Sequence, residues 1–161
     1  MARQTYTTSL RVAQQSRGNR AVLVQIMYKI ADIDMQRLDL RNALRIYEQI
    51  RTLEPEDIHS RARLVDINFR ISQNAAALNE MDGFLALLEN NNNHTAAIEF
   101  LQEVLVDQPD RTDIRKRLAE VYRRASKMDE AVHQLETISN QLMNKKCTSM
   151  VARMRHCRGR R

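Results

Sequence analysis

Cysteines, histidines and paired carboxylates are the residues of this 161-residue sequence that could bind a metal ion or move protons. Cys147, His156 and Cys157 lie close enough in sequence to reach one ion, but a zinc site in a protein usually has four ligands. The remaining histidines are scattered, and no HExxH or CxxC spacing accompanies them. The sequence therefore predicts no metal site.

Three carboxylate pairs are the remaining candidates for acid–base catalysis. Their positions correspond to helix surfaces or helix starts, where acidic side chains interact favourably with the helix dipole. The three glycines are isolated and cannot form a phosphate-binding loop. We therefore predict a non-enzymatic protein without catalytic or cofactor-binding residues. The pairs are Glu80/Asp82, Asp107/Asp110 and Asp129/Glu130.

Positive charge gathers in two segments, residues 111–127 and 145–161, which carry seven cations each. Residues 71–110 carry seven acids and no lysine or arginine. Such cations can contact phosphates, so nucleic-acid binding through helix 111–127 and the basic tail is an alternative function. Single-strand readers usually add exposed aromatic side chains, whereas aromatics make up 4% of this chain. The mixed charge also fits charged protein partners, or self-association of the basic ends with the acidic middle.

The elements that would position these residues are helices. Three glycines and two prolines are too few for the many turns of an all-β fold. No apolar run is long enough to span a bilayer, and no secretory signal precedes residue 20, so we expect a cytoplasmic protein without a membrane partner. Apolar residues recur at helical spacing and predict seven or eight helices. Their expected ranges are 4–17, 21–36, 40–53, 58–71, 75–89, 95–107, 112–125 and 128–143.

The sequence also repeats itself after 54 residues, which is three helices. About a dozen positions agree in one register without a gap. Methionines at helical spacing, among them Met27, Met81, Met128 and Met143, are interpreted as core, with an adaptable peptide-binding surface as the alternative. The aligned positions include Leu10/Leu64/Leu118, Gly18/Ser72/Ser126, Met27/Met81/Leu135, Ile30/Phe84/Ile138, Pro55/Pro109 and Arg61/Arg115.

One stretch of this repeat resembles a known family. Leu118-Ala119, Tyr122, Ser126, Ala131, Leu135 and Ile138 resemble a unit of the tetratricopeptide repeat (TPR), a helix–turn–helix of 34 residues. Ala43, Tyr47, Ile50 and Pro55 resemble the second helix of another unit, and so do Ala97, Leu101, Val104 and Pro109. Arg115 departs from the family pattern, which usually has an aromatic residue there. The alternative is an unrelated helical bundle in which alanine and leucine merely follow helical periodicity.

The resemblance implies an all-α, antiparallel helical-repeat solenoid that acts as a protein- or peptide-binding scaffold. We expect a weak capping helix over residues 1–20, the repeat domain over 21–144 and a basic tail over 145–161. Because Asp66 and Glu120 stand where one subset of the family needs asparagine, capture of a C-terminal carboxylate is not expected. The partner-binding residues that the resemblance implies are His59, Asp66, Phe69, Arg70, Asp113, Lys116, Glu120, Arg123 and Arg124.

Overall fold

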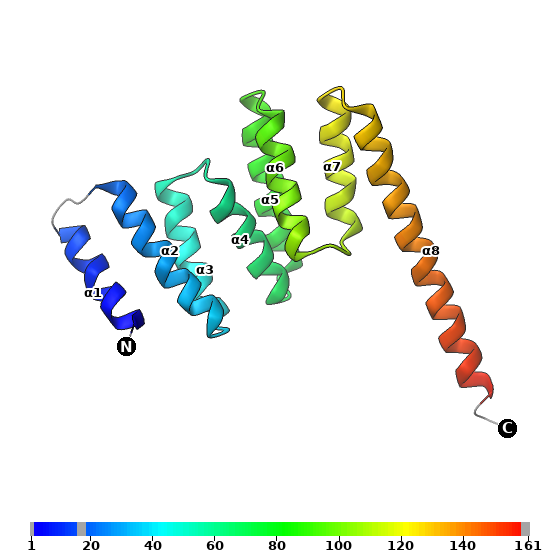
Figure 1. The fold of residues 1–161 in the computed structure, drawn as a ribbon, viewed down its shortest axis with the longest axis horizontal. Helices are drawn as coiled ribbons and strands as arrows, with labels where there is room; N and C mark the ends of the chain where they lie inside the picture. Colours follow the sequence, from blue (N-terminus) through cyan, green and yellow to red (C-terminus); the bar gives the residue numbers. More distant parts are fainter. Residues whose placement is uncertain (1, 16–18, 159–161) are drawn as a thin grey trace. The chain divides into compact units, whose positions relative to one another are not determined.

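The helices occupy almost the whole chain. A computed structural model describes the backbone of residues 2–15 and 19–158, and the side chains of residues 4–12, 19–144 and 146. None of the described residues lies in a strand, so the all-α prediction is confirmed (Figure 1). The helices are α1 (Ala2–Gln15), α2 (Arg20–Gln36), α3 (Leu40–Leu53), α4 (Ile58–Arg70), α5 (Asn74–Asn90), α6 (His94–Asp107), α7 (Thr112–Arg124) and α8 (Met128–Arg158).

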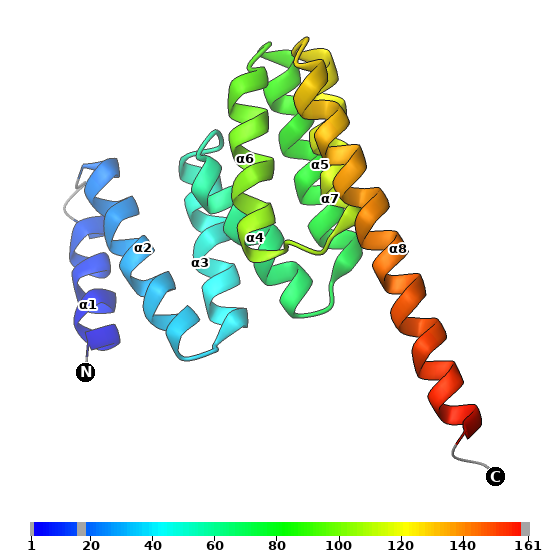
Figure 2. The ribbon, with the colours of Figure 1, turned by 45° about the vertical axis from the view of Figure 1, so that its right-hand side comes forward.

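These helices form two compact units, residues 1–96 and residues 97–161. In the first unit α1 packs on α2, α2 on α3, α3 on α4 and α4 on α5 (Figure 2). In the second unit α7 packs on α8. Side-chain atoms also join α6 to α7 there, since Gln102 Nε2 donates to Tyr122 Oη at 2.9 Å. Within each unit, helices that follow each other in sequence are therefore neighbours, as expected of a helical repeat.

The 54-residue repeat is confirmed by the helix boundaries. A shift of 54 residues carries α2 onto α5, α3 onto α6 and α4 onto α7, and the first and last residues of the two helices coincide in each pair. The third copy departs from this pattern after α8 begins. Whereas α5 ends at Asn90, α8 continues to Arg158. The backbone of residues 145–158, part of the segment predicted as a basic tail, thus extends α8.

Four turns between helices share one geometry. Leu38, Ser72, Asn92 and Ser126 have left-handed backbones, with φ of 59°, 63°, 52° and 59°. After each of them the next residue donates its N–H to the carbonyl five residues back, at 2.8–2.9 Å. This is the hydrogen bond of a Schellman motif, which closes the C-terminus of a helix. None of the four residues is glycine, although glycine adopts this conformation without steric cost.

One buried apolar cluster joins α2, α3 and α4 in the first unit. Val24 and Met27 of α2, Ala43 and Tyr47 of α3, and Leu64 of α4 are buried in one cluster. The small Ala43 side chain lets α2 and α3 approach, and larger residues fill the grooves beside it. Met27 and Met81 are buried as predicted. The core interpretation is wrong for Met128 and Met143, which are exposed at 58% and 62%, because no described residue covers that face of α8.

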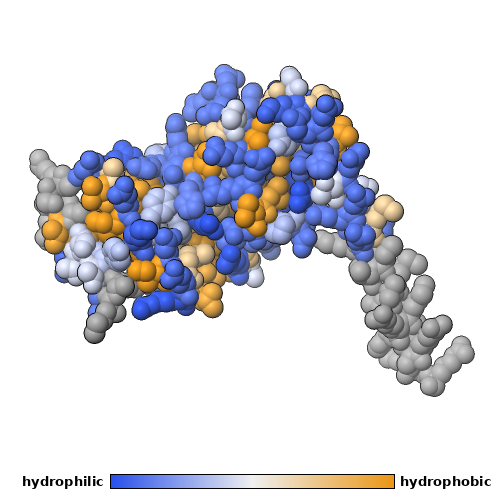
Figure 3. Space-filling model, viewed as in Figure 1, coloured by the Kyte–Doolittle hydropathy of each residue, from blue (hydrophilic) through white to orange (hydrophobic). Residues whose placement is uncertain are grey.

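On the face shown in Figure 3 hydrophilic residues predominate and hydrophobic ones form small separate areas. No helix within residues 2–15 and 19–158 combines the length and hydropathy needed to cross a membrane.

Candidate functional site

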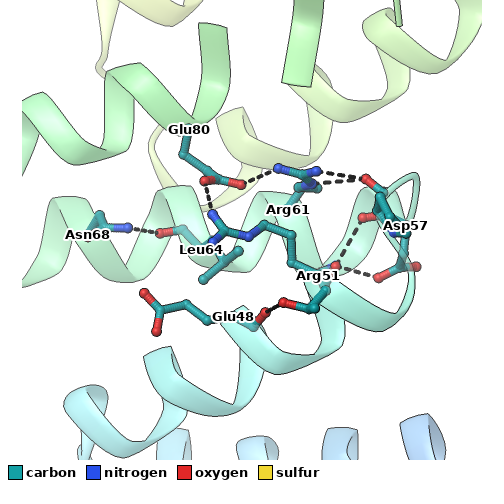
Figure 4. A network of polar contacts seen from close by, with 10 residues as sticks. Glu48, Arg51, Asp57, Arg61, Leu64, Asn68 and Glu80 are labelled. Carbon is teal, nitrogen blue, oxygen red and sulfur yellow. Dashed lines mark hydrogen bonds and ion pairs between the residues drawn. The ribbon is translucent and has the colours of Figure 1, made fainter. Parts of the chain in front are cut away.

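Arg61 ties three successive elements of the first unit together (Figure 4). Its Nε and Nη2 donate to the carbonyl of Pro55, at 3.0 and 2.9 Å, and its Nη1 donates to Glu80 Oε1 at 2.6 Å. Arg51 Nη1 reaches the other carboxylate oxygen of Glu80 at 2.5 Å. The Arg61 guanidinium also lies 4.9 Å above the ring of Phe84. These contacts fix the proline loop and α4 against α5.

Arg115 makes the corresponding contacts in the second unit. Its Nη2 donates to the carbonyl of Pro109 at 3.0 Å, and its Nη1 donates to Gln134 Oε1 at 3.1 Å. Pro109 accepts a second hydrogen bond from Gln141 Nε2 at 3.2 Å. Both arginines thus have a structural role. This role was not predicted from the sequence. The signal for it was the alignment of Arg61 with Arg115 and of Pro55 with Pro109 in the 54-residue repeat.

His59 lies beside a buried polar contact rather than in a reactive group. Its ring is 5.5 Å from the ring of Tyr28, and Tyr28 Oη donates to Asp57 Oδ2. Asp57 also caps α4 by accepting from the backbone N–H of Ser60 at 2.8 Å. Burial, with the Asp57 hydrogen bond second, raises the pKa of Tyr28, and burial raises the pKa of Tyr47 to about 12. Both tyrosines therefore stay protonated at neutral pH and serve packing.

The predicted partner-binding residues on α4 do not form one accessible surface. Asp66 and Phe69 are buried, and Arg70 Nε pairs with Asp66 Oδ2 at 2.8 Å. His59 and Arg70 are the exposed members of this set. A ligand approaching α4 from solvent would therefore meet two of these four residues.

The predicted residues on α7 do converge. Lys116, Glu120 and Arg123 line one groove of about 330 Å³ between α7 and the start of α8. Glu120 Oε1 pairs with Arg124 Nη2 at 2.7 Å, at the edge of this groove. Asp113 lies outside the groove lining and pairs with Arg111 at 3.1 Å. The complete lining is Lys116, Ala119, Glu120, Arg123, Met128, Ala131, Val132 and Leu135.

The two walls of this groove differ in character. The α7 wall carries two cations and one acid, and within the described part of the chain Lys116 and Arg123 form no ion pair. The α8 wall is apolar, and Val132 and Leu135 are 50% and 54% exposed. The groove can therefore hold an apolar side chain beside an acidic one. Among residues with described side chains, no group of three His, Cys, Asp or Glu is placed to hold a metal ion. The cluster of Cys147, His156 and Cys157 lies outside those residues.

Sequence reasoning missed the α8 wall. Leu135 aligns with Met27 and Met81, which are both buried, but is itself 54% exposed. The sequence does contain a signal for this exposure. In its C-terminal part it lacks a third copy of the apolar face of α6, since Arg155 and Arg158 stand where α6 has Leu101 and Val104.

Residues 87–153, less than half of the chain, match the tetratricopeptide repeat family. No curated protein matches the sequence. Among solved structures, a crystal structure of MamA is 16% identical, with a TM-score of 0.41, 90% of this chain covered and 89% of that chain. A MamA RS-1 ArsTM double mutant is 12% identical, with a TM-score of 0.36 and coverages of 89% and 96%. MamA 41-end from Desulfovibrio magneticus RS-1 is also 12% identical, with a TM-score of 0.36 and coverages of 88% and 96%.

The family match, the eight helices of the described residues and the 54-residue register together identify a TPR-like helical-repeat protein. Repeats of this type support protein-interaction scaffolds.

Proposed function

We propose that this chain is a non-enzymatic scaffold that binds a protein or peptide in the groove between α7 and α8. The observation that carries this proposal is the convergence of Lys116, Glu120 and Arg123 with the apolar residues Val132 and Leu135 around one groove. Because Arg124 neutralises Glu120, the two other charged side chains favour a ligand with acidic groups. A cytoplasmic location stays a prediction from the sequence.

Most other cations of residues 111–127 are engaged within the protein, which weakens the case for nucleic-acid binding. Arg111 pairs with Asp113, Arg124 pairs with Glu120, and Arg115 holds the Pro109 loop. Arg117 Nη1 donates to the backbone carbonyl of Asp113 at 3.3 Å. Phosphate binding would compete with these contacts, whereas a peptide in the groove would leave them in place.

The proposal is tested by selecting a displayed library of random peptides on the full chain. We expect enriched peptides that carry apolar and acidic residues and lose binding to the double variant Lys116→Glu, Arg123→Glu. The matched control is Lys29→Glu, Arg41→Glu, which changes the same charge at exposed positions of α2 and α3. Enriched peptides that bind both double variants equally would contradict the proposed site. Tighter binding of a generic oligonucleotide than of any peptide, with a steep loss in salt, would favour the nucleic-acid alternative.

A further inference from the structure

Large apolar side chains of α8 form an exposed stripe. Val132, Leu135 and Leu142 are 50%, 54% and 48% exposed, and their spacing of three and seven residues places them on one helix face. A protein with a separate, complete core has no need of such a stripe, because exposed apolar area is unfavourable in water. We therefore ask which element covers this face in the other copies of the repeat.

The repeat register shows that this face is buried wherever the repeat is complete. Shifting by 54 residues carries Leu135 and Leu142 onto Met81 and Leu88 of α5, which are 0% and 3% exposed. A further shift carries Leu135 onto Met27 of α2, which is 1% exposed. The same position is thus core in two copies and surface in the third.

In the first unit the structure shows which element covers this face. Helix α3 packs on α2 and shares one buried cluster with Met27. Its contact face consists of a small residue followed by large ones four and seven positions later, which allows close approach of the helices and filling of the grooves. Helix α6 repeats that spacing. The two sets are Ala43, Tyr47 and Ile50, and Ala97, Leu101 and Val104.

The third copy lacks the turn that would bring such a helix back over α8. The first two copies turn at Leu38 and Asn92, which have left-handed backbones. Lys146 occupies the corresponding position, and the backbone there is helical. Residues 148–158 therefore prolong α8 instead of returning across its apolar stripe.

We propose that the stripe of α8 and the adjoining groove bind an amphipathic helix of a partner protein, in the way that α2 binds α3. The docking helix carries alanine, a large apolar residue and a β-branched residue at the spacing of α6, with acidic residues on its flank. The acidic flank lies along Lys116 and Arg123, which line the same groove as Val132 and Leu135. This inference rests on the proposed scaffold function and names the class of partner.

Helix α6 itself provides the probe, since it has the required face, three acids and no lysine or arginine. The probe is a fluorescein-labelled peptide of sequence His94–Asp107, stapled through positions 102 and 106 because both are exposed here. Stapling removes the low helicity of an isolated 14-residue peptide as a cause of failure. Fluorescence anisotropy measures its binding to the full chain. We expect saturable binding that weakens at least tenfold with Leu135→Asp and severalfold with Lys116→Glu, Arg123→Glu.

Two controls isolate the stripe. Leu38→Asp introduces the same change at a leucine that is 77% exposed in the first unit, and it should leave peptide binding unchanged. A peptide with Leu101→Asp and Val104→Asp keeps the length and staple but should not bind. Circular dichroism of the Leu135→Asp variant should match the unsubstituted chain, because the side chain is exposed.

Several outcomes would overturn the proposal. One is no binding of the α6 peptide; another is equal binding to the Leu135→Asp variant. A dimer in sedimentation that excludes the peptide and dissociates with Leu135→Asp would also overturn it, because a second copy would then cover the stripe. Library peptides that still depend on Lys116 and Arg123, together with no α6-peptide binding, would leave the scaffold function standing and refute the helix as partner.

Discussion

The two units tie their proline loops to the neighbouring helices with the same geometry and different chemistry. In the first unit Arg61 bonds twice to the Pro55 carbonyl and faces the carboxylate of Glu80, with side-chain exposures of 13% for both residues. In the second unit Arg115 bonds once to Pro109, and the neutral Gln134 takes the place of the carboxylate.

The difference shows which part of this arrangement the fold requires. In both copies the arginine bonds to the proline carbonyl and to a side chain of the following helix. The fold therefore requires an acceptor at that position of the following helix, and the acceptor need not be charged. A partly buried ion pair between a guanidinium and a carboxylate is stronger than a hydrogen bond from a guanidinium to an uncharged acceptor, and it costs more when broken. Gln141 also holds the Pro109 carbonyl, which leaves the second unit less dependent on its arginine.

The largest effects are expected in the cores of the two units. Leu64→Ala and Leu118→Ala remove equivalent side chains that are each 1% exposed, so each should lower the free energy of unfolding by about 2–5 kcal/mol. Ala131→Leu should cost about 1–3 kcal/mol by overpacking against α7. Urea denaturation measures these values, and hydrogen exchange assigns each loss to one unit. A Leu118→Ala variant as stable as the unsubstituted chain would show that the repeat register is wrong in the second unit.

The two arginines should differ by a smaller amount. Arg61→Ala breaks an ion pair with Glu80 besides its hydrogen bonds to Pro55 and should cost roughly 1.5–3 kcal/mol, whereas Arg115→Ala breaks hydrogen bonds to uncharged acceptors alone and should cost less, roughly 0.5–1.5 kcal/mol. Glu80→Gln gives the first unit the chemistry of the second and should reduce the effect of Arg61→Ala in a double-mutant cycle. Thermal melts and urea denaturation provide the measurement. Equal costs for both alanine variants would refute the comparison.

A substitution in the turns is expected to raise the free energy of unfolding, whereas the preceding substitutions lower it. Leu38 and Asn92 are equivalent and both left-handed, but asparagine tolerates this conformation better than leucine. Leu38→Gly should therefore raise the free energy of unfolding by about 1 kcal/mol, while Asn92→Gly should leave it nearly unchanged. Calorimetric melting temperatures of the two variants check this. A destabilised Leu38→Gly variant would mean that the exposed leucine makes contacts that matter.

The smallest expected change in stability follows removal of the C-terminal segment. Truncation after Asn144 deletes seven cations and no acid, so retention on heparin should fall. This attraction is electrostatic and is screened beyond about 8–10 Å at physiological salt. The melting temperature should stay the same if residues 145–161 add no core. A collapse of the second unit would instead identify residues 145–158 as a necessary part of its core.

Much of the fold could be predicted from particular residues. Asp57 and Pro55 mark the start of α4, and the Ser72 and Asn92 turns end the helices before them. These features are local, since capping and turn formation depend on a few neighbouring residues. The helix limits therefore agree with the expected ranges within one or two residues up to the start of α8.

The candidate site was less predictable because accessibility depends on distant packing. Asp66 and Glu120 hold the same position in the repeat, yet Asp66 is buried and Glu120 lines a groove. Met81 and Leu135 are likewise equivalent in sequence and opposite in exposure. No periodicity distinguishes the members of each pair, since both have the spacing of a core face.

The sequence alone determined the helices, their turns and the 54-residue register, because these depend on side-chain periodicity and on short-range hydrogen bonds. Tertiary structure alone decided that α8 runs on past Lys146 without the turn made at Leu38 and Asn92. It also decided that Val132, Leu135 and Leu142 remain on the surface. Burial of a helix face requires a second helix that returns across it, and whether that helix returns is a property of the folded chain.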